Sequence, residues 1–314
     1  MMDALKEVIK QPYWVIALVL GGLLVALPCI TIDKDHHWTT HPPDSLLLVV
    51  VGIALLLVSV AAFGFWLWPK HATGDDSDAG LDLALVKESD GVISTTVGDC
   101  EIRVINGRLE DHPCEAGTAI VLPCNEYFDD QCAADPRSAL GAYVGRIFEG
   151  QAARFMALVK DECKRRFGDG IGRQKTDDER GKSFGTGRCV LLSRPLDRSM
   201  SVALVSTTTQ RAGEGLAARI SYLFEGMREL VTRLADARIS DVAMPVLGAG
   251  HGHIHASLAL VGLILAVAEA ARYGQGGQRL RRVTIVVFRR DAASAAEVDP
   301  IVIRRTLALV GSRD

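Results

Sequence analysis

The stretch MPVLGAGHGHIHASLAL, residues 244–260, joins two apolar runs through a glycine-rich segment. Gly248, Gly250 and Gly252 stand at alternating positions, and glycine permits positive φ angles and close approach of a ligand to the backbone. The apolar run that ends at Leu247 predicts a strand, and the run after 254 predicts a helix whose N-terminus favours anions. This strand, loop and helix together predict a cradle for phosphate oxygens.

Two other phosphate-binding motifs do not match. A dinucleotide-binding fingerprint needs a third glycine three residues after the second, and Gly252 arrives one position early. A Walker A loop needs a glycine five residues before its Gly-Lys-Ser, and the segment GKS at 181–183 has Thr176 at that place. The remaining alternative to a phosphate loop at 248–252 is a simple glycine turn.

Around this loop the sequence alternates strand and helix patterns, which predicts a mixed or parallel sheet with helices on both faces. The helix over 254–273 is very apolar, but its uncharged part is too short for a membrane span and predicts a buried helix. The polar connection 168–186 is either a flap over a site or a surface excursion. The strands are expected near 101–106, 118–123, 187–192, 201–207, 240–247 and 282–288, and the helices near 138–167, 214–236, 254–273 and 297–310. In the first helix, the residues expected to face the sheet are Leu140, Tyr143, Val144, Ile147, Phe148, Phe155, Leu158 and Val159.

The start of the chain has a different character. Residues 13–32 and 46–68 contain no charge, and each run is about long enough to cross roughly 30 Å of hydrocarbon as a helix. Basic residues flank the pair on its outer sides, so both termini are expected to face the cytoplasm. We therefore expect a transmembrane hairpin over 1–70, a polar linker over 71–80, and one α/β domain over 81–314.

Composition limits the other classes of partner. The net charge is −3, which does not indicate nucleic-acid binding. The seven cysteines are odd in number and form no CxxC pair, so we expect reduced thiols and neither a disulfide framework nor a metal site.

Three segments resemble a known family. MPVLGAGHGHIHAS resembles the phosphate loop of macro domains, and EIRVINGRLEDHPCEAGTAIVLPCNEYFDD, residues 101–130, resembles their opening strand, turn and strand. NEYFDD at 125–130 and KSFGTG at 182–187 are more specific, and resemble the macro domain of membrane-bound type II Thoeris antiphage effectors. Those effectors have two transmembrane helices before the macro domain, which is also the order expected here.

The resemblance implies an ADP-ribose derivative as ligand and no cofactor. The diphosphate would lie along the glycine loop, with Asn125 facing the distal ribose or its substituent. Phe128 either stacks on a ligand ring or fills the core, and Glu126 and Asp129 either recognise a cationic or imidazole-bearing substituent or cap the next helix. Arg108 departs from the family pattern, which has an adenine-binding Asp there; either Asp111 substitutes or the base is read differently. The loop residues implied to contact the ligand are Leu247, Gly248, Ala249, Gly250, His251, Gly252 and His253. The two histidines either touch the phosphate or flank the loop.

The resemblance also implies a function. A partner enzyme with a TIR domain would make the signal from NAD, with histidine-ADP-ribose expected, and the macro domain would bind it without catalysis. The helices, in the lipid bilayer of the cell inner membrane, would then disrupt that membrane, and the protein would act as a homo-oligomer. The alternative is a membrane-anchored ADP-ribosyl hydrolase that uses Asp129 or His251 as its base.

Overall fold

The protein is described by a computed structural model. The chain divides into two compact units, Met1–Ala79 and Gly80–Asp314. The structure describes residues 30–32, 38–40, 81–113, 115–176, 179–213, 215–273, 280–290 and 297–311.

The described part of the first unit is a small antiparallel pair of strands. Strand β1, Ile30–Ile32, pairs with β2, Trp38–Thr40, with Ile32 opposite Trp38. The prediction of one helix over 13–32 is therefore wrong for its last three residues, which are extended and take their hydrogen bonds from a neighbouring strand. The rest of both predicted spans, and the linker 71–80, lie outside the described residues.

The second unit is built on a nine-stranded sheet. Its order is β11-β10-β6-β12-β13-β5-β4-β3, and β9 also pairs with β10. The five central strands β10, β6, β12, β13 and β5 are parallel, and the outer strands are antiparallel to their neighbours. The bounds are β3 Lys87–Ser89, β4 Val92–Val97, β5 Cys100–Gly107, β6 Thr118–Asn125, β9 Cys189–Leu192, β10 Ser201–Arg211, β11 Gly215–Ala218, β12 Asp241–Pro245 and β13 Arg282–Phe288.

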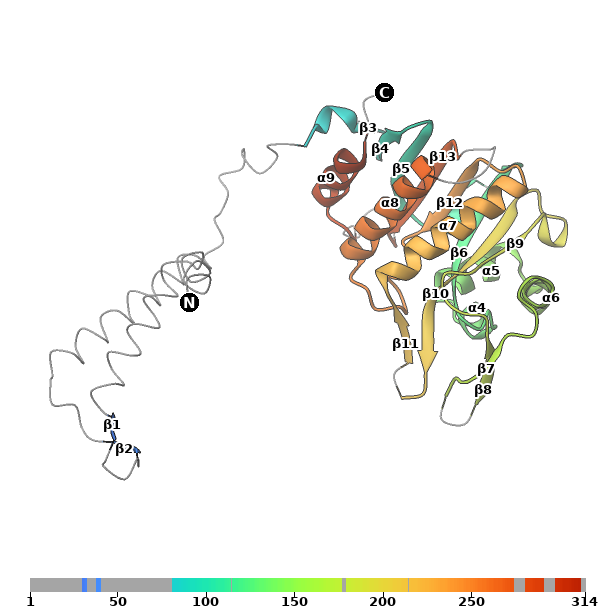
Figure 1. The fold of residues 1–314 in the computed structure, drawn as a ribbon. Helices are drawn as coiled ribbons and strands as arrows, with labels where there is room; N and C mark the ends of the chain where they lie inside the picture. Colours follow the sequence, from blue (N-terminus) through green and yellow to red (C-terminus); the bar gives the residue numbers. More distant parts are fainter. Residues whose placement is uncertain are drawn as a thin grey trace. The chain divides into compact units, whose positions relative to one another are not determined.

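Helices cover both faces of this sheet. On one face α7, α8 and α9 pack over the strands, and on the other lie α5 and α6 (Figure 1). Each central strand sends alternate side chains into two separate cores, as a sheet buried on both faces requires. The helices are η2 Leu83–Leu85, η3 Leu109–Asp111, α4 Gln131–Ala134, α5 Ala139–Ile147, α6 Ala152–Phe167, η4 Pro195–Asp197, α7 Ile220–Asp236, α8 Ala256–Tyr273 and α9 Pro300–Val310.

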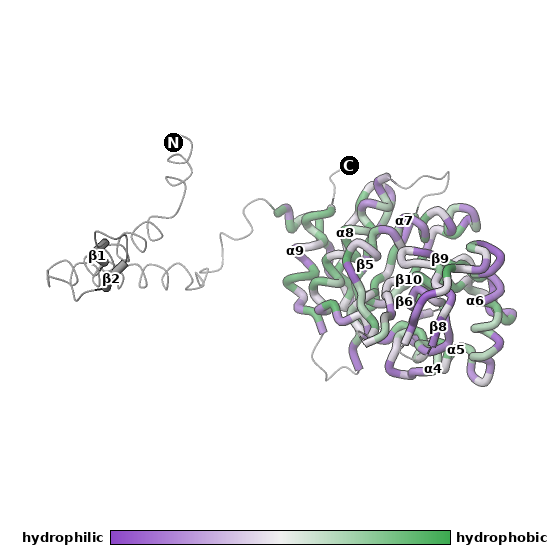
Figure 2. Tube along the Cα trace, turned by 60° about the horizontal axis from the view of Figure 1, so that its bottom comes forward, coloured by the Kyte–Doolittle hydropathy of each residue, from purple (hydrophilic) through white to green (hydrophobic). Residues whose placement is uncertain are grey.

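Helix α8 is long and apolar enough to cross a membrane when judged by length and composition alone. In the structure it packs against α7 and α9, and ten of its residues are buried. Figure 2 shows hydrophobic colour along α8 and α9, whereas α6 and the β8 region carry hydrophilic colour. The packing agrees with the prediction of a buried core helix.

Three predictions about the helices differ from the structure. The single helix expected over 138–167 is two helices, because Gly150 has φ +68° and interrupts the chain between α5 and α6. Leu158 is 37% exposed and does not face the core as expected, whereas the half-buried Ile147 packs against the core. The helix expected from 214 begins only at Ile220, after strand β11.

Residues 168–186 contain a β-hairpin. Strand β7, Ile171–Gln174, pairs with β8, Arg180–Ser183, as a separate two-stranded sheet. The side chains of this hairpin are mostly exposed, which explains why its sequence is polar and gave no strand signal. A few side chains of the hairpin face the domain and make buried contacts, which are described with the candidate site below.

Candidate functional site

The candidate site lies where the parallel strands end. The carboxyl ends of parallel strands meet at one edge of a sheet, and crevices at that edge are the usual binding places in α/β folds. Here β6 ends at Asn125, β12 at Pro245, β13 at Phe288 and β5 at Gly107. The predicted glycine loop follows β12, and the surrounding residues come from the other three strands and from β10 and β11.

The glycine loop uses its carbonyls for its own fold and leaves its amides unused. Within the part of the chain that the structure describes, the amides of Gly248–Gly252 donate no hydrogen bond. Gly250 has open space where a Cβ would be, whereas a Cβ on Gly252 would lie 2.6 Å from that of Ala218. A row of unpaired amides at an open surface is a binding place for an anion. The glycine carbonyls accept hydrogen bonds from the amides of Ile254, His253 and Ala218, at 3.2, 3.0 and 3.0 Å.

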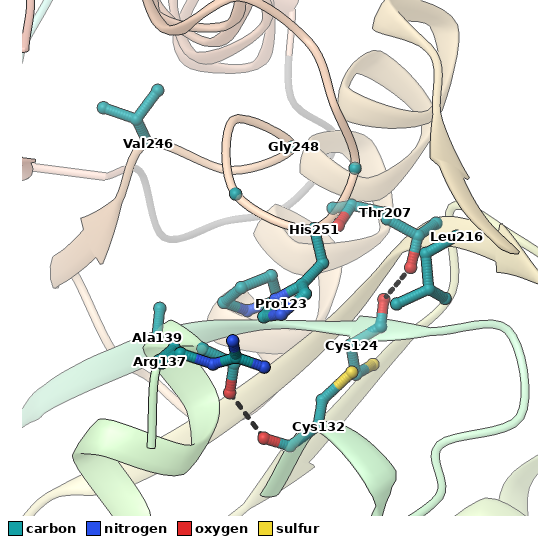
Figure 3. A pocket seen from close by; sticks show the side chains of 14 residues that line it. Pro123, Cys124, Cys132, Arg137, Ala139, Thr207, Leu216, Val246, Gly248 and His251 are labelled. Atoms are coloured by element: carbon teal, nitrogen blue, oxygen red, sulfur yellow. Dashed lines mark hydrogen bonds between the residues drawn. The ribbon is translucent and has the colours of Figure 1, made fainter. Parts of the chain in front are cut away.

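This loop borders a cleft with two chambers. The larger chamber has a volume of about 410 Å³ and reaches the ends of β5 and β13. The smaller one has a volume of about 80 Å³ and lies between the glycine loop, β10, β11 and α4 (Figure 3). The chambers meet where Arg137 and Ser138 face Gly250, since these residues line both.

A cluster of polar side-chain contacts joins the two walls of the cleft. His251 Nε2 lies 3.1 Å from Asp135 Oδ2, so the glycine loop contacts the segment between α4 and α5. Arg137 donates to both oxygens of Asp135, at 3.1 and 3.0 Å. These hydrogen bonds, with a smaller effect of His251, lower the pKa of Asp135 to about 2. Asp135 therefore stays ionised and holds His251 at the cleft.

Glu126 does not line the cleft. Its carboxylate is 2% exposed and accepts hydrogen bonds from the Ser183 hydroxyl and, at 3.3 Å, from Arg173 Nη1. It also accepts from the amide of Gln210 at 3.4 Å. The carboxylate thus fastens the β7–β8 hairpin to β10, and its charge is compensated within the protein.

Asn125 and Asp129 are also held by internal contacts. Asn125 is 1% exposed, and its amide group bonds the backbone of Tyr127 at 3.0 Å and Asp129 Oδ1 at 3.1 Å. Asp129 Oδ2 lies 2.8 Å from Lys175 Nζ, and Lys175 also lies 3.3 Å from Glu179. These contacts shape the turn after β6. Asp129 Oδ1 also accepts a hydrogen bond from the amide of Gln131, the first residue of α4, at 3.2 Å, which fits the capping alternative for Asp129. Glu126 instead bonds the hairpin and β10, so the capping alternative does not describe it.

Phe128 belongs to the core. It is fully buried with φ +49°, and its ring lies 6.2 Å from those of both Phe167 and Phe184. The core alternative therefore accounts for Phe128. Leu247 is likewise fully buried, and His253 has φ +58° and is exposed beside the loop.

The far end of the larger chamber contains residues that the sequence did not single out. Phe288 ends β13, lines this chamber, and is 54% exposed. Glu110 lies there too, and its carboxylate accepts from Arg108 Nε at 2.7 Å. Asp111, considered as the base-reading acid, instead pairs with Arg146 at 2.8 Å and does not line the chamber. The sequence signal for Phe288 is an aromatic residue at the end of the apolar run 282–288.

The described cysteines, Cys100, Cys124, Cys132, Cys163 and Cys189, are free thiols. Cys124 and Cys132 line the smaller chamber (Figure 3). Burial raises the pKa of Cys132 to about 11 and that of Cys124 well above its ordinary value. Both are therefore neutral at pH 7. No group of three or more His, Cys, Asp or Glu side chains suited to a metal ion occurs within the described ranges.

Several solved structures are similar to this chain. The macrodomain of Oceanobacillus iheyensis with ADP has a TM-score of 0.45 and 11% identity, over 63% of this chain and 89% of that one. The macrodomain of Thermus aquaticus DarG has a TM-score of 0.39 and 20% identity, over 59% and 97%. The Trypanosoma brucei macrodomain in complex with ADP-ribose has a TM-score of 0.38 and 14% identity, over 59% and 63%. No curated protein matches the sequence.

The family comparison is more specific than these likenesses. The family model described as "Thoeris protein ThsA, Macro domain" matches residues 114–287, which is more than half of the chain. The matched range contains the acidic turn after β6, the β7–β8 hairpin, the glycine loop and most of the strands that bear the cleft. The chain belongs to the Thoeris ThsA macro-domain family.

Proposed function

We propose that this macro domain binds an ADP-ribose-derived signal in the two-chamber cleft. The proposal rests on the backbone amides of Gly248–Gly252, which have no hydrogen-bond partner among the described residues and lie at the junction of the chambers. A diphosphate placed there would accept several backbone hydrogen bonds without requiring a basic side chain. The relatives with ADP and with ADP-ribose are in keeping with such a ligand.

The shape of the cleft supports one direction for the ligand. The base would occupy the larger chamber, where Phe288 offers a ring for stacking. The group beyond the diphosphate would enter the smaller chamber, beside His251. We therefore propose that any substituent on the distal ribose is read near His251, because Glu126 and Asp129 are engaged elsewhere.

We further propose that the full-length protein is a membrane-anchored antiphage effector. A TIR-domain partner would supply the signal, with histidine-ADP-ribose as the expected form, and the N-terminal helices would disrupt the inner membrane as a homo-oligomer. A ligand can shift a resting–active equilibrium only by its differential affinity for the two states. A shift from 1:99 to 99:1 takes roughly 5.5 kcal/mol, which a ligand that contacts both cleft walls can supply.

A hydrolase remains the second candidate, and one observation favours it. His251 is held 3.1 Å from an ionised carboxylate at the smaller chamber, which is how a general base is often oriented. Asp129 does not suit that role, since Lys175 pairs with it. The two candidates predict different fates for the same bound ligand.

The test is titration of the full-length protein in lipid nanodiscs with ADP-ribose and histidine-ADP-ribose. Heat of binding and a raised melting temperature are expected, with the ligand recovered intact by chromatography. Turnover of the ligand would favour the hydrolase. Absence of binding to both compounds would overturn the proposal. Dye release from liposomes that contain the protein, on addition of the bound ligand, tests the effector part separately.

A further inference from the structure

Thr207 stands out in the wall of the smaller chamber. Its side chain is fully buried, and within the described residues its hydroxyl oxygen has no hydrogen-bond partner. Figure 3 shows Thr207 beside the glycine loop, with Arg137 and Cys132 on the other side of the pocket. A buried hydroxyl without a partner is costly, so it needs an explanation from the site.

A β-bulge places this side chain in the chamber. The pairing of β10 with β6 shifts register between Ser206 and Thr208, which leaves Thr207 as the extra residue. Successive residues of a regular strand point to opposite faces, yet Thr207 and Thr208 both line the smaller chamber. Bulges re-aim side chains in this way next to binding sites.

The neighbouring hydroxyls already have partners. Thr208 Oγ1 donates to the carbonyl of Cys124 at 3.4 Å. The Ser138 hydroxyl donates to the carbonyl of Cys132 and accepts from the amide of Gly141 at 2.8 Å. Among these three chamber hydroxyls, Thr207 alone is left to hydrogen-bond an incoming group.

We propose that Thr207 is a specificity residue that hydrogen-bonds a hydroxyl-bearing group of the ligand beyond the diphosphate. This inference rests on the proposed function and names the part of the ligand that the smaller chamber reads. At about 80 Å³ this chamber admits only a small group, well below the 300 Å³ or more of a whole ligand pocket. A hydroxyl can both donate to and accept from Thr207, so a sugar-like group fits the chemistry.

The direction in which the melting temperature changes when Thr207 is replaced distinguishes a ligand-binding role from a structural role. Replacing Thr207 by valine removes a hydroxyl that has no hydrogen-bond partner among the described residues, while the branched shape is kept. The melting temperature of the free protein should therefore stay unchanged or rise. A hydroxyl that holds the fold together, directly or through a buried water, would instead lower it.

The experiment compares ADP with ADP-ribose as ligands of the full-length protein in nanodiscs. In Thr207→Val we expect the Kd for ADP-ribose to rise about tenfold and the Kd for ADP to stay the same. Thr207→Ser should restore most of the affinity. Thr209→Val is the matched control, because its hydroxyl bonds Ala217 on β11 outside the chamber, and both Kd values should stay unchanged.

Two results would overturn the inference. Equal Kd changes for both ligands, or none for either, would show that Thr207 does not read the group beyond the diphosphate. A lower melting temperature with unchanged affinities would assign the hydroxyl a structural role. If the wild-type protein binds neither ADP nor ADP-ribose, the Kd of histidine-ADP-ribose is compared between wild type and Thr207→Val instead. If that compound does not bind the wild-type protein either, the proposed function fails and this inference fails with it.

Discussion

The glycine loop and the acidic turn after β6 lie at the same edge of the sheet. They differ in whether their polar groups are hydrogen-bonded within the protein. In residues 125–129 the amide of Asn125 and both carboxylates are consumed by contacts with the backbone, Arg173 and Lys175. In Gly248–Gly252 the backbone amides have no partner in the part of the chain that the structure describes, and they lie beside an open cleft. The type of a residue therefore does not show whether its polar groups are free to bind a ligand. Here the charged side chains stabilise the fold, and the backbone amides are left to bind an anion.

The largest expected effect comes from blocking the loop. Gly250→Val should abolish ligand binding, with at least a hundredfold loss, because its side chain would enter the space at which the two chambers meet. The fold should survive, since nothing lies within 4 Å of the added Cβ. Titration with ADP-ribose and a thermal melt measure both quantities.

Gly252→Ala is the contrasting variant. Its Cβ would lie 2.6 Å from Ala218 Cβ and 2.7 Å from the carbonyl oxygen of Gly248, so the melting temperature should fall. Normal ligand affinity in Gly250→Val would show that the glycine loop does not bind the ligand. The contrast between the two regions would then be wrong.

The acidic turn should respond in the opposite sense. Glu126→Gln weakens the hydrogen bonds to Arg173 and Ser183, and we expect a loss of about 1–3 kcal/mol in the free energy of unfolding. The Kd for ADP-ribose should change less than twofold. Urea denaturation and calorimetric titration provide the two measurements.

Asp111→Asn is the matched surface control for Glu126. Its ion pair with Arg146 is about half-exposed on both sides, so the expected loss of stability is below about 1 kcal/mol. A large loss of ligand affinity in Glu126→Gln, without a loss of stability, would reverse the roles assigned to the two regions.

A smaller effect is expected at the far end of the cleft. Phe288→Ala should weaken binding about tenfold through loss of stacking on the base, with little change in stability because the ring is 54% exposed. The affinity for ribose 5-phosphate, which has no base, should not respond to the substitution. Equal losses for ligands with and without a base would contradict this placement.

The smallest expected effect is a change in the pKa of Asp135. The pKa of Asp135 is about 2, below its ordinary 3.8, because Arg137 donates hydrogen bonds to the ionised form. The stabilisation from this ion pair is complete above pH 3.8 and is lost as the pH falls through about 2. In Arg137→Ala the pKa should rise toward 3.8, which a carboxyl-carbon NMR titration will detect. A pKa that does not move would mean that another group holds Asp135.

Much of the fold could be read from the sequence because its signals are local. The apolar runs at 118–123, 201–207 and 282–288 became the central strands β6, β10 and β13. Strands β3, β4, β7, β8 and β11 were not predicted. In β7, β8 and β11 the glycine-containing sequences are exposed or only partly buried and lack an apolar pattern. The break between α5 and α6 at Gly150 was hidden by apolar spacing that continues on both sides.

The sequence by itself determined the sheet, the buried helix α8 and the glycine loop, since periodicity, length and backbone freedom are properties of neighbouring residues. Only the tertiary structure decided which polar groups stay available. Lys175 and Arg173 come from a hairpin some 45 residues beyond the acids that they neutralise. Thr207 and Phe288 reach the cleft from two other strands, because the carboxyl ends of parallel strands meet at one edge. Pairing across such distances leaves no local pattern, and this is why the acids resembled ligand contacts in the sequence.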